Sequence, residues 1–285
     1  MNERGMMLSV LACGLLVIGW PAAGLAQATE PAGEPFVQAR FMAEMGFLAP
    51  LEHSLKFDRN TPAGTTATDF DLVAEGGQDN LFLFARLAAE LELDGRHVIT
   101  FLYQPLELTG RVTAERPLVF DAVEFPTGTP LEVRYGFPFY RLSYMYDFFG
   151  HTRRHELALG TSMQIRNATI VLTAVDGSQR VDRRDIGPVP LIKLRGRYGF
   201  PCGFYLAGEV DGIWAPISYI NGSDSDTEGA LIDLNLQAGF PALASADLFL
   251  NLRYLAGGAT SEDSSNWLHF LTLSLGVNWC VTDLR

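Results

Sequence analysis

The sequence is poor in positive charge, and above all in lysine. Against 33 acidic residues it has 21 basic ones, of which only Lys56 and Lys193 are lysines, so the formal net charge is −12. An acidic excess of this size argues against a nucleic-acid partner, because phosphate backbones bind basic surfaces. The other basic residues are arginines, whose planar guanidinium groups favour fixed ion pairs.

Cysteine and long apolar runs are also scarce. Cys13, Cys202 and Cys280 are the only cysteines, too few for a small fold built on disulfides. Beyond the first 26 residues, no stretch approaches the roughly 18–20 consecutive apolar residues of a transmembrane helix. Helical spacing of apolar residues is not sustained there either, which argues against a helical fold.

The first residues have the pattern of an export signal. Arg4 precedes an apolar stretch that ends at Pro21, and the small-x-small sequence Gly24-Leu25-Ala26 follows. A charged start, an apolar middle and a small-residue end are typical of a secretory signal peptide. We therefore expect a cleaved signal peptide at 1–26, with cleavage after Ala26 or Ala28, and one mature domain at 27–285. An uncleaved anchor helix is the alternative.

The mature chain alternates apolar and polar residues. In 37–47 and in 271–279 the odd positions are apolar, and most even positions are polar or small. A period of two is typical of strands with one apolar and one polar face. The pattern predicts ten strands, at 36–48, 80–93, 96–109, 130–148, 155–174, 187–200, 203–216, 229–240, 246–258 and 266–280.

The lengths of the strands and of their connections indicate a membrane barrel. Most strands match or exceed the roughly 9–11 residues that a tilted strand needs to cross a bilayer. Long connections at 49–79, 110–129, 175–186, 217–228 and 259–265 alternate with short ones. This order is typical of a barrel with both termini in the periplasm. We predict an all-β fold, a closed antiparallel transmembrane β-barrel of about ten strands. Eight or twelve strands are the alternatives, because 49–58 and 117–123 could pair differently.

A set of aromatic residues adds a resemblance to this pattern. Tyr140, Tyr144, Tyr146, Phe148 and Phe149 lie near one predicted strand end, like the interfacial girdle of a membrane barrel. The chain resembles bacterial outer-membrane β-barrel proteins. The stretch Gly187-Pro188-Val189-Pro190-Leu191 and the strands after it are similar to small, roughly ten-stranded barrels of unassigned function. The resemblance implies a bacterial outer membrane, contact with its lipid, and assembly by the barrel-assembly machinery, and it leaves the oligomeric state open.

Charged residues on the polar faces predict the contents of the barrel. If one turn centres on Cys202, Lys193 faces Asp211 and Arg195 faces Glu209 across neighbouring strands. If another centres on Leu243, Asp233 faces Arg253, and Asn235 faces Asn251. Opposed charges stabilise such a strand pair by only ~0.2–1 kcal/mol each. The predicted polar lumen is therefore structural, formed by Lys193, Arg195, Glu209, Asp211, Asp233 and Arg253. A narrow ion or solute path through it is the alternative.

The sequence indicates no catalytic, cofactor-binding or metal-ligating residue. A serine activated by a histidine on the same strand must lie two residues from it, and none of the five histidines has Ser or Thr at that spacing. The favoured function is a non-enzymatic envelope barrel, structural or loop-presenting, with at most a narrow channel. One alternative is a barrel enzyme that acts on outer-membrane lipid or peptide. Another is a soluble periplasmic barrel that binds an apolar ligand, with Leu194 and Leu206 facing inward.

Overall fold

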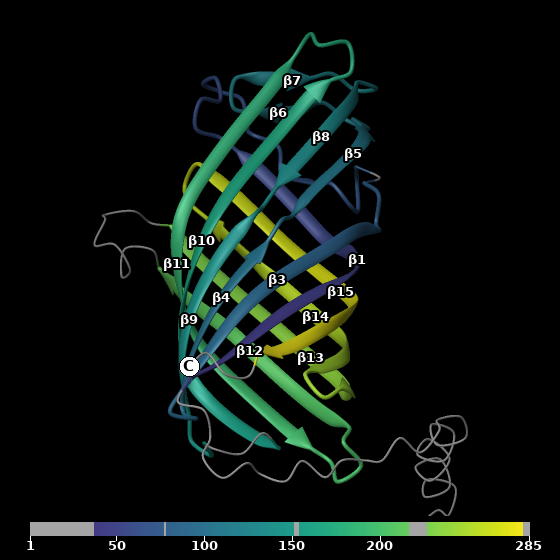
Figure 1. The fold of residues 1–285 in the computed structure, drawn as a ribbon. Helices are drawn as coiled ribbons and strands as arrows, with labels where there is room; N and C mark the ends of the chain where they lie inside the picture. The colour runs from purple at the N-terminus through teal and green to yellow at the C-terminus, as the bar shows by residue number, and fades with distance from the viewer. Residues whose placement is uncertain (1–36, 77, 151–153, 217–226, 282–285) are drawn as a thin grey trace, which may run out of the picture. The chain divides into compact units, whose positions relative to one another are not determined.

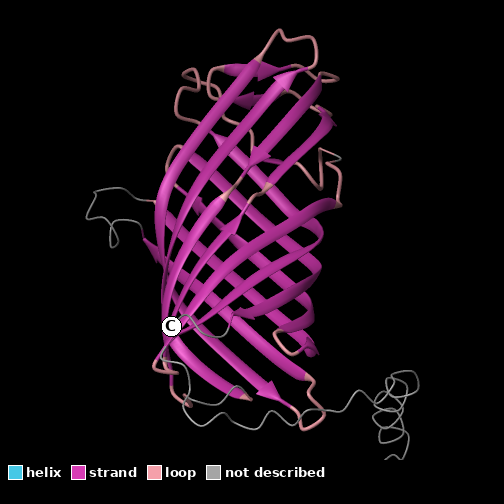
Figure 2. Ribbon diagram, in the orientation of Figure 1, coloured by secondary structure: helices cyan, strands magenta, loops and turns pink. Residues whose placement is uncertain are grey.

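The alternating sequence folds into a closed barrel of ten antiparallel strands (Figures 1 and 2). The computed structural model describes residues 37–76, 78–150, 154–216 and 227–281, so the predicted signal peptide at 1–26 lies outside the described residues. Within those ranges, no helix is long and apolar enough to cross a membrane.

Ten wall strands follow one another around the barrel, and two of them are interrupted. The first interrupted strand consists of β4 (His97–Gln104) and β5 (Glu107–Thr113), and the second consists of β8 (Pro130–Gly136) and β9 (Phe139–Asp147). The continuous strands are β1 (Val37–Phe57), β3 (Phe82–Leu93), β10 (His155–Ala174), β11 (Arg180–Gly199), β12 (Tyr205–Pro216), β13 (Glu228–Leu243), β14 (Ala246–Thr260) and β15 (Ser264–Val281). The barrel closes because β15 pairs with β1 from Ala39–Val281 to Phe57–Ser264.

The interruptions lie side by side. β4 pairs with β9 and β5 pairs with β8, so both neighbours lose their regular pairing at the same height. Each break contains a proline, Pro105 in one strand and Pro138 in the other. Proline has no N–H group and cannot donate to the ladder, which explains why the strand pairing is interrupted here.

The predicted strands agree with the observed wall, but several outer strand ends were predicted as loops. β1 continues to Phe57, β11 begins at Arg180 and β15 begins at Ser264, where the sequence predicted connections at 49–79, 175–186 and 259–265. These ends keep strand pairing while their outward side chains become charged or polar. Apolar alternation therefore stops before the strand does. The turn at Asp94-Gly95 is as predicted, and both residues adopt the left-handed φ of a tight hairpin, 51° and 63°.

The two faces of the wall are reversed relative to a soluble protein. On β15, Leu275 is 67% exposed and its neighbour Ser274 is 2% exposed. On β11, Lys193 is 2% exposed and Leu194 is 46% exposed, while Leu206 on β12 also faces outward. The wall therefore carries an apolar outer ring around a polar interior. The alternative with Leu194 and Leu206 inside is wrong.

The aromatic residues of β9 divide between its two ends. Tyr140 is the second residue of β9 and stacks on Tyr103, with ring centroids 4.9 Å apart. Tyr146 lies near its other end, opposite His97, and its ring packs edge-on against Phe148 at 5.6 Å. The prediction of a girdle at one strand end is therefore wrong for Tyr140, because the wall strand formed by β8 and β9 runs from Pro130 to Asp147 and Tyr140 lies near its middle.

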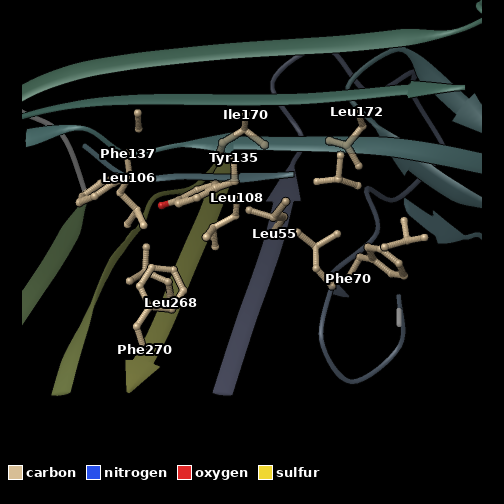
Figure 3. Packing of buried hydrophobic residues seen from close by; sticks show 14 of the residues in the cluster. Leu55, Phe70, Leu106, Leu108, Tyr135, Phe137, Ile170, Leu172, Leu268 and Phe270 are labelled. Carbon is tan, nitrogen blue, oxygen red and sulfur yellow. The ribbon is translucent and has the colours of Figure 1, made fainter. Parts of the chain in front are cut away.

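An apolar cap fills the interior at the end where the long loops lie. Two short strands from these loops, β6 (Leu118–Phe120) and β7 (Val123–Phe125), form a hairpin, and β2 (Phe70–Asp71) pairs with β1. Phe70, Phe120 and Phe125 are buried, and they belong to one cluster with residues of the wall near the long loops. Figure 3 shows part of this cluster, with Leu55 on β1, Tyr135 on β8 and Ile170 on β10 pointing toward one another. The segment 117–123 thus forms part of an internal cap and does not add a wall strand.

Candidate functional site: an ion network inside the barrel

The first predicted hairpin places its charged residues as the sequence predicted. Lys193 lies opposite Asp211, and Arg195 lies opposite Glu209. The Lys193 ammonium contacts two carboxylates, with Nζ 2.8 Å from Asp211 Oδ2 and 2.5 Å from Glu209 Oε1. Arg195 reaches across the lumen to Glu90 on β3 and also contacts Glu156 on β10, at 2.5 Å each. Glu209 therefore pairs with Lys193 and not with the arginine opposite it.

The second predicted hairpin has the right face and the wrong register. Arg253 lies opposite Asn235, and Leu255 lies opposite Asp233, so the pairing is shifted by two residues from the register predicted with a turn centred on Leu243. A shift of two keeps each side chain on its face. Arg253 consequently still meets Asp233, on the diagonal, with Nε 2.6 Å from Oδ1 and Nη2 2.8 Å from Oδ2.

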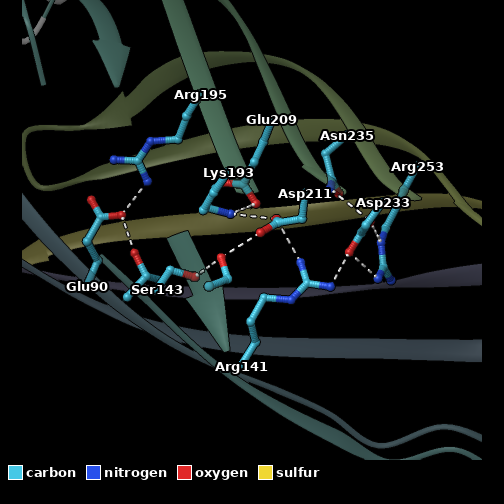
Figure 4. Close-up of polar contacts among 12 residues, drawn as sticks. Glu90, Arg141, Ser143, Lys193, Arg195, Glu209, Asp211, Asp233, Asn235 and Arg253 are labelled. Carbon is cyan, nitrogen blue, oxygen red and sulfur yellow. Dashed lines mark hydrogen bonds and ion pairs between the residues drawn. The ribbon is translucent and has the colours of Figure 1, made fainter. Parts of the chain in front are cut away.

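Arg141 of β9 joins the two hairpins. Its Nη1 lies 2.8 Å from Asp211 Oδ2, and its Nη2 lies 2.9 Å from Asp233 Oδ2. The same side chain donates to Gln164 Oε1, and Ser162 donates to Asp211 Oδ1 at 2.6 Å. Figure 4 shows the resulting chain of contacts from Lys193 through Arg141 to Arg253. The sequence predicts an inward-facing Arg141 on its strand, but Arg141 is not one of the six residues named for the lumen, and its link between the two hairpins was not predicted.

A second cluster lies closer to the short turns. Arg40 of β1 bridges two carboxylates of β3, with Nη1 2.8 Å from Glu90 Oε1 and Nη2 2.6 Å from Glu92 Oε2. Glu44 pairs with Arg86 on the same two strands. Asn251 donates to Glu44 Oε2 at 3.0 Å and to Asn235 Oδ1 at 3.2 Å. These contacts extend the network from β1 to β14.

The whole network is close to electrically balanced. Its cations are Arg40, Arg86, Arg141, Lys193, Arg195 and Arg253, and its anions are Glu44, Glu90, Glu92, Glu156, Glu209, Asp211 and Asp233. Each contacts at least one group of opposite charge, which is what lets charges remain buried. Eight strands contribute, so the network ties distant parts of the wall together. It holds no arrangement that points to a reaction.

The cap is fixed to the wall by polar contacts that the sequence did not predict. Asp121, at the tip of the β6–β7 hairpin, accepts a hydrogen bond from Arg183 Nε at 2.8 Å, and its backbone N–H donates to Phe57 O at 2.8 Å. Thr68 N–H donates to Val119 O at 2.8 Å. Beneath the cap, His53 packs edge-on against Tyr135, with ring centroids 4.3 Å apart. The mouth of the barrel is thus covered by side chains and by the chain itself.

Comparison with known proteins bears on this architecture. No protein-family model and no curated protein sequence matches the chain. The outer-membrane protease OmpT of Escherichia coli is similar in structure, with a TM-score of 0.58 at 9% sequence identity over 86% of this chain and 97% of that one. The chain has the fold of a bacterial outer-membrane β-barrel. At this identity the likeness concerns the fold alone.

Two further barrels align over similar lengths with lower scores. The outer-membrane protein AlkL has a TM-score of 0.39 at 14% identity, over 93% of this chain and 97% of that one. The toluene transporter TodX of Pseudomonas putida has a TM-score of 0.35 at 6% identity, over 85% of this chain and 89% of that one. Neither bears on the function of this outer-membrane-type barrel.

Proposed function

We propose that this barrel lies in a bacterial outer membrane as a non-enzymatic, non-conducting envelope protein, whose outer strands and loops are presented beyond the membrane. Export through the cleaved signal peptide at 1–26, and assembly by the barrel-assembly machinery, belong to this proposal. The short turns then lie in the periplasm and the capped mouth lies outside the cell.

The apolar outer ring supports the membrane location. Large apolar side chains are exposed on strand after strand, among them Phe47, Leu87, Leu159, Leu236 and Leu273. Exposed apolar area on this scale would destabilise a protein in water, and the same ring is what a bilayer requires. Tyr and Trp side chains at its edges match the interfacial depth at which these residues are enriched.

The filled interior is the observation that carries the absence of conduction. Asp211 and Asp233 have no exposed surface, and Arg141 and Arg253 are each 1% exposed. Above them the apolar cap contains Phe70, which is also buried. A ten-stranded barrel has little more room than its own side chains occupy. An ion that entered from the end with the short turns would meet the paired charges first and the apolar cap next.

The outermost strands support the presenting role. β5, β8, β10 and β11 continue beyond the apolar ring and form a sheet with an exposed outer face. Its ion pairs, Arg111–Glu132 and Arg134–Glu107, are half exposed or more. Such pairs contribute about 0–1 kcal/mol to stability, so this face is tolerant of change and available for contact.

Conductance of the purified protein in a planar lipid bilayer tests the proposal. We expect insertion without stepwise current in concentrated KCl, whereas a porin reconstituted in the same way gives regular steps. Reproducible steps of one size from this protein would refute the sealed lumen and favour a narrow channel.

Three of the described histidines do not favour the enzyme alternative. His53, His97 and His269 contact Gln78, Tyr144 and Tyr254, at 3.3, 2.8 and 2.7 Å respectively. A serine or cysteine nucleophile needs a base within hydrogen-bond distance, and the partners of these three histidines are an amide and two phenol groups. Lipid A of unchanged mass in an overexpressing strain is the expected result.

A further inference from the structure

The outer face of the wall carries a groove across β11, β12 and β13. Its volume is about 670 Å³. Gly196, Gly208 and Ala238 form its floor, where side chains are missing or small, and Leu206 and Leu236 stand beside them.

The two glycines are not required by the backbone. Neither adopts a left-handed φ. A Cβ at Gly196 would lie 3.8 Å from Glu156 O, and one at Gly208 would lie 3.8 Å from Leu236 Cδ2, both ordinary contacts. Glycine within a strand weakens it and often marks a place where another molecule approaches closely. Larger residues would fit at both positions and fill the groove.

The surroundings of the groove indicate what fills it. Leu157, Leu250 and Leu252 continue its apolar lining onto β10 and β14, so the groove is part of the apolar ring. Toward the short turns it ends at Tyr198, whose ring lies 4.8 Å from that of His155. An occupant therefore meets hydrocarbon along its length and polar-tipped rings at one end.

We propose that this groove binds one acyl chain of a phospholipid from the periplasmic leaflet, with the lipid head group at the level of Tyr198 and His155. The inference rests on the proposed membrane location. We choose an acyl chain over a folded protein partner for two reasons. The groove is continuous with the lipid-facing apolar ring, and it ends at the side chains of Tyr198 and His155, where the head group of a lipid in one leaflet would lie. The floor at Gly208 lets the acyl chain lie against the backbone of β12.

Native mass spectrometry of delipidated protein, titrated with phosphatidylethanolamine in mild detergent, tests the site. The wild type should bind one phospholipid saturably. Gly208→Leu/Ala238→Leu, which fills the groove, should weaken that binding about tenfold, the effect of roughly two lost methylene contacts. Ala43→Leu is the matched control, because Ala43 is exposed on the outer face of β1, away from the groove, and it should leave binding unchanged.

Equal binding by the groove-filled and wild-type proteins would overturn the inference. So would a dimer that binds no lipid and disappears in the filled variant, since a second copy would then be the occupant. If the double variant does not fold, Gly208→Ala decides, with a smaller loss expected in the same direction. Gel mobility of the same samples with and without heating reports the barrel separately, so a failed membrane assignment and a failed lipid site remain distinguishable.

Discussion

At the scale of single residues, Asp211 is the centre of the interior. Its carboxylate accepts from Arg141, Lys193 and Ser162, on three other strands, and it has no exposed surface. A buried charge of this kind adds modestly to stability while it is paired and becomes costly when its partner is lost. The network therefore specifies one arrangement of the wall more than it adds net stability.

Asp211→Asn should destabilise the barrel by about 3–5 kcal/mol, because it leaves the buried Lys193 and Arg141 short of one anion. Unfolding in urea, followed by tryptophan fluorescence in lipid vesicles, measures the change. Glu132→Gln removes a carboxylate from an exposed pair and should change stability by less than about 1 kcal/mol. Equal effects of the two variants would mean that the interior is hydrated and open.

Glu209→Gln tests the first hairpin separately. Glu209 contacts Lys193 at 2.5 Å, and its side chain is 20% exposed, so the loss should be smaller than for Asp211→Asn. We expect about 1–3 kcal/mol, the usual penalty for an impaired buried partner, read as a lower midpoint of heat unfolding. An unchanged midpoint would contradict the observed pairing of Lys193.

His53 makes the cap sensitive to acid. It lies above the apolar ring, at the height of the outward pair Glu52 and His269, and burial lowers its pKa to about 4 from 6.5. The unfolded chain binds a proton between these values and the folded chain does not. The contribution of His53 to the free energy of unfolding is therefore fully present above pH 6.5. It declines by up to about 3 kcal/mol as the pH falls toward 4. His53→Gln should remove this decline when urea midpoints above and below the window are compared. The same decline in both proteins would assign it to other groups.

At the scale of elements, the bulge in β1 decides which residues of the outer half of the strand face inward. The pairing with β15 shifts between Pro50 and Glu52. Before it, Leu48 faces inward at an even position, and after it Leu55 and Phe57 face inward at odd ones. One extra residue, Leu51, thus moves the inward face from even to odd positions, and the strand lines the polar lumen below and the apolar cap above.

Deletion of Leu51 should leave the cap in place. It removes the bulge, and Glu52 then follows Pro50 in a regular period of two that keeps Leu55 and Phe57 facing inward. Insertion of one alanine after Ser54 should instead turn Leu55 and Phe57 outward, so that the β6–β7 hairpin loses its contacts with β1. We expect slow hydrogen exchange at 118–125 in the deletion and rapid exchange in the insertion, with the short-turn half of the barrel protected in both. Equal protection at 118–125 in the two variants would contradict this account of the strand.

The elements that the sequence predicted are those whose period is unbroken. β3, β10 and β12 alternate along their length, and the predicted ranges 80–93, 155–174 and 203–216 enclose them. The sequence could not indicate that β1 passes Leu51, because a bulge disrupts the only signal available. Nor could it set the register of β13 and β14, since the alternation alone did not fix the position of the turn between them. For the network, the alternation predicted the inward face of Lys193 and Arg253, but contacts across the lumen, such as Arg141 with Asp211, depend on closure of the barrel.

At the scale of the whole molecule, the interior has two layers of opposite character. Paired charges fill the half beside the short turns, and the apolar cluster fills the half beside the long loops. The outer surface also changes from the short turns to the long loops, from an apolar ring to exposed ion pairs such as Arg111–Glu132. Both follow from one rule of the wall, that alternate residues face opposite sides.

The measurement that tests this account most directly is the gel mobility of the membrane-extracted protein in mild detergent, with and without boiling. A closed barrel with a lipid-facing ring should be recovered from the outer-membrane fraction and should migrate differently before and after heating, because only heat opens it. A protein found in the soluble periplasm, with one mobility in both conditions, would contradict the membrane barrel and remove the reason for its exposed apolar ring.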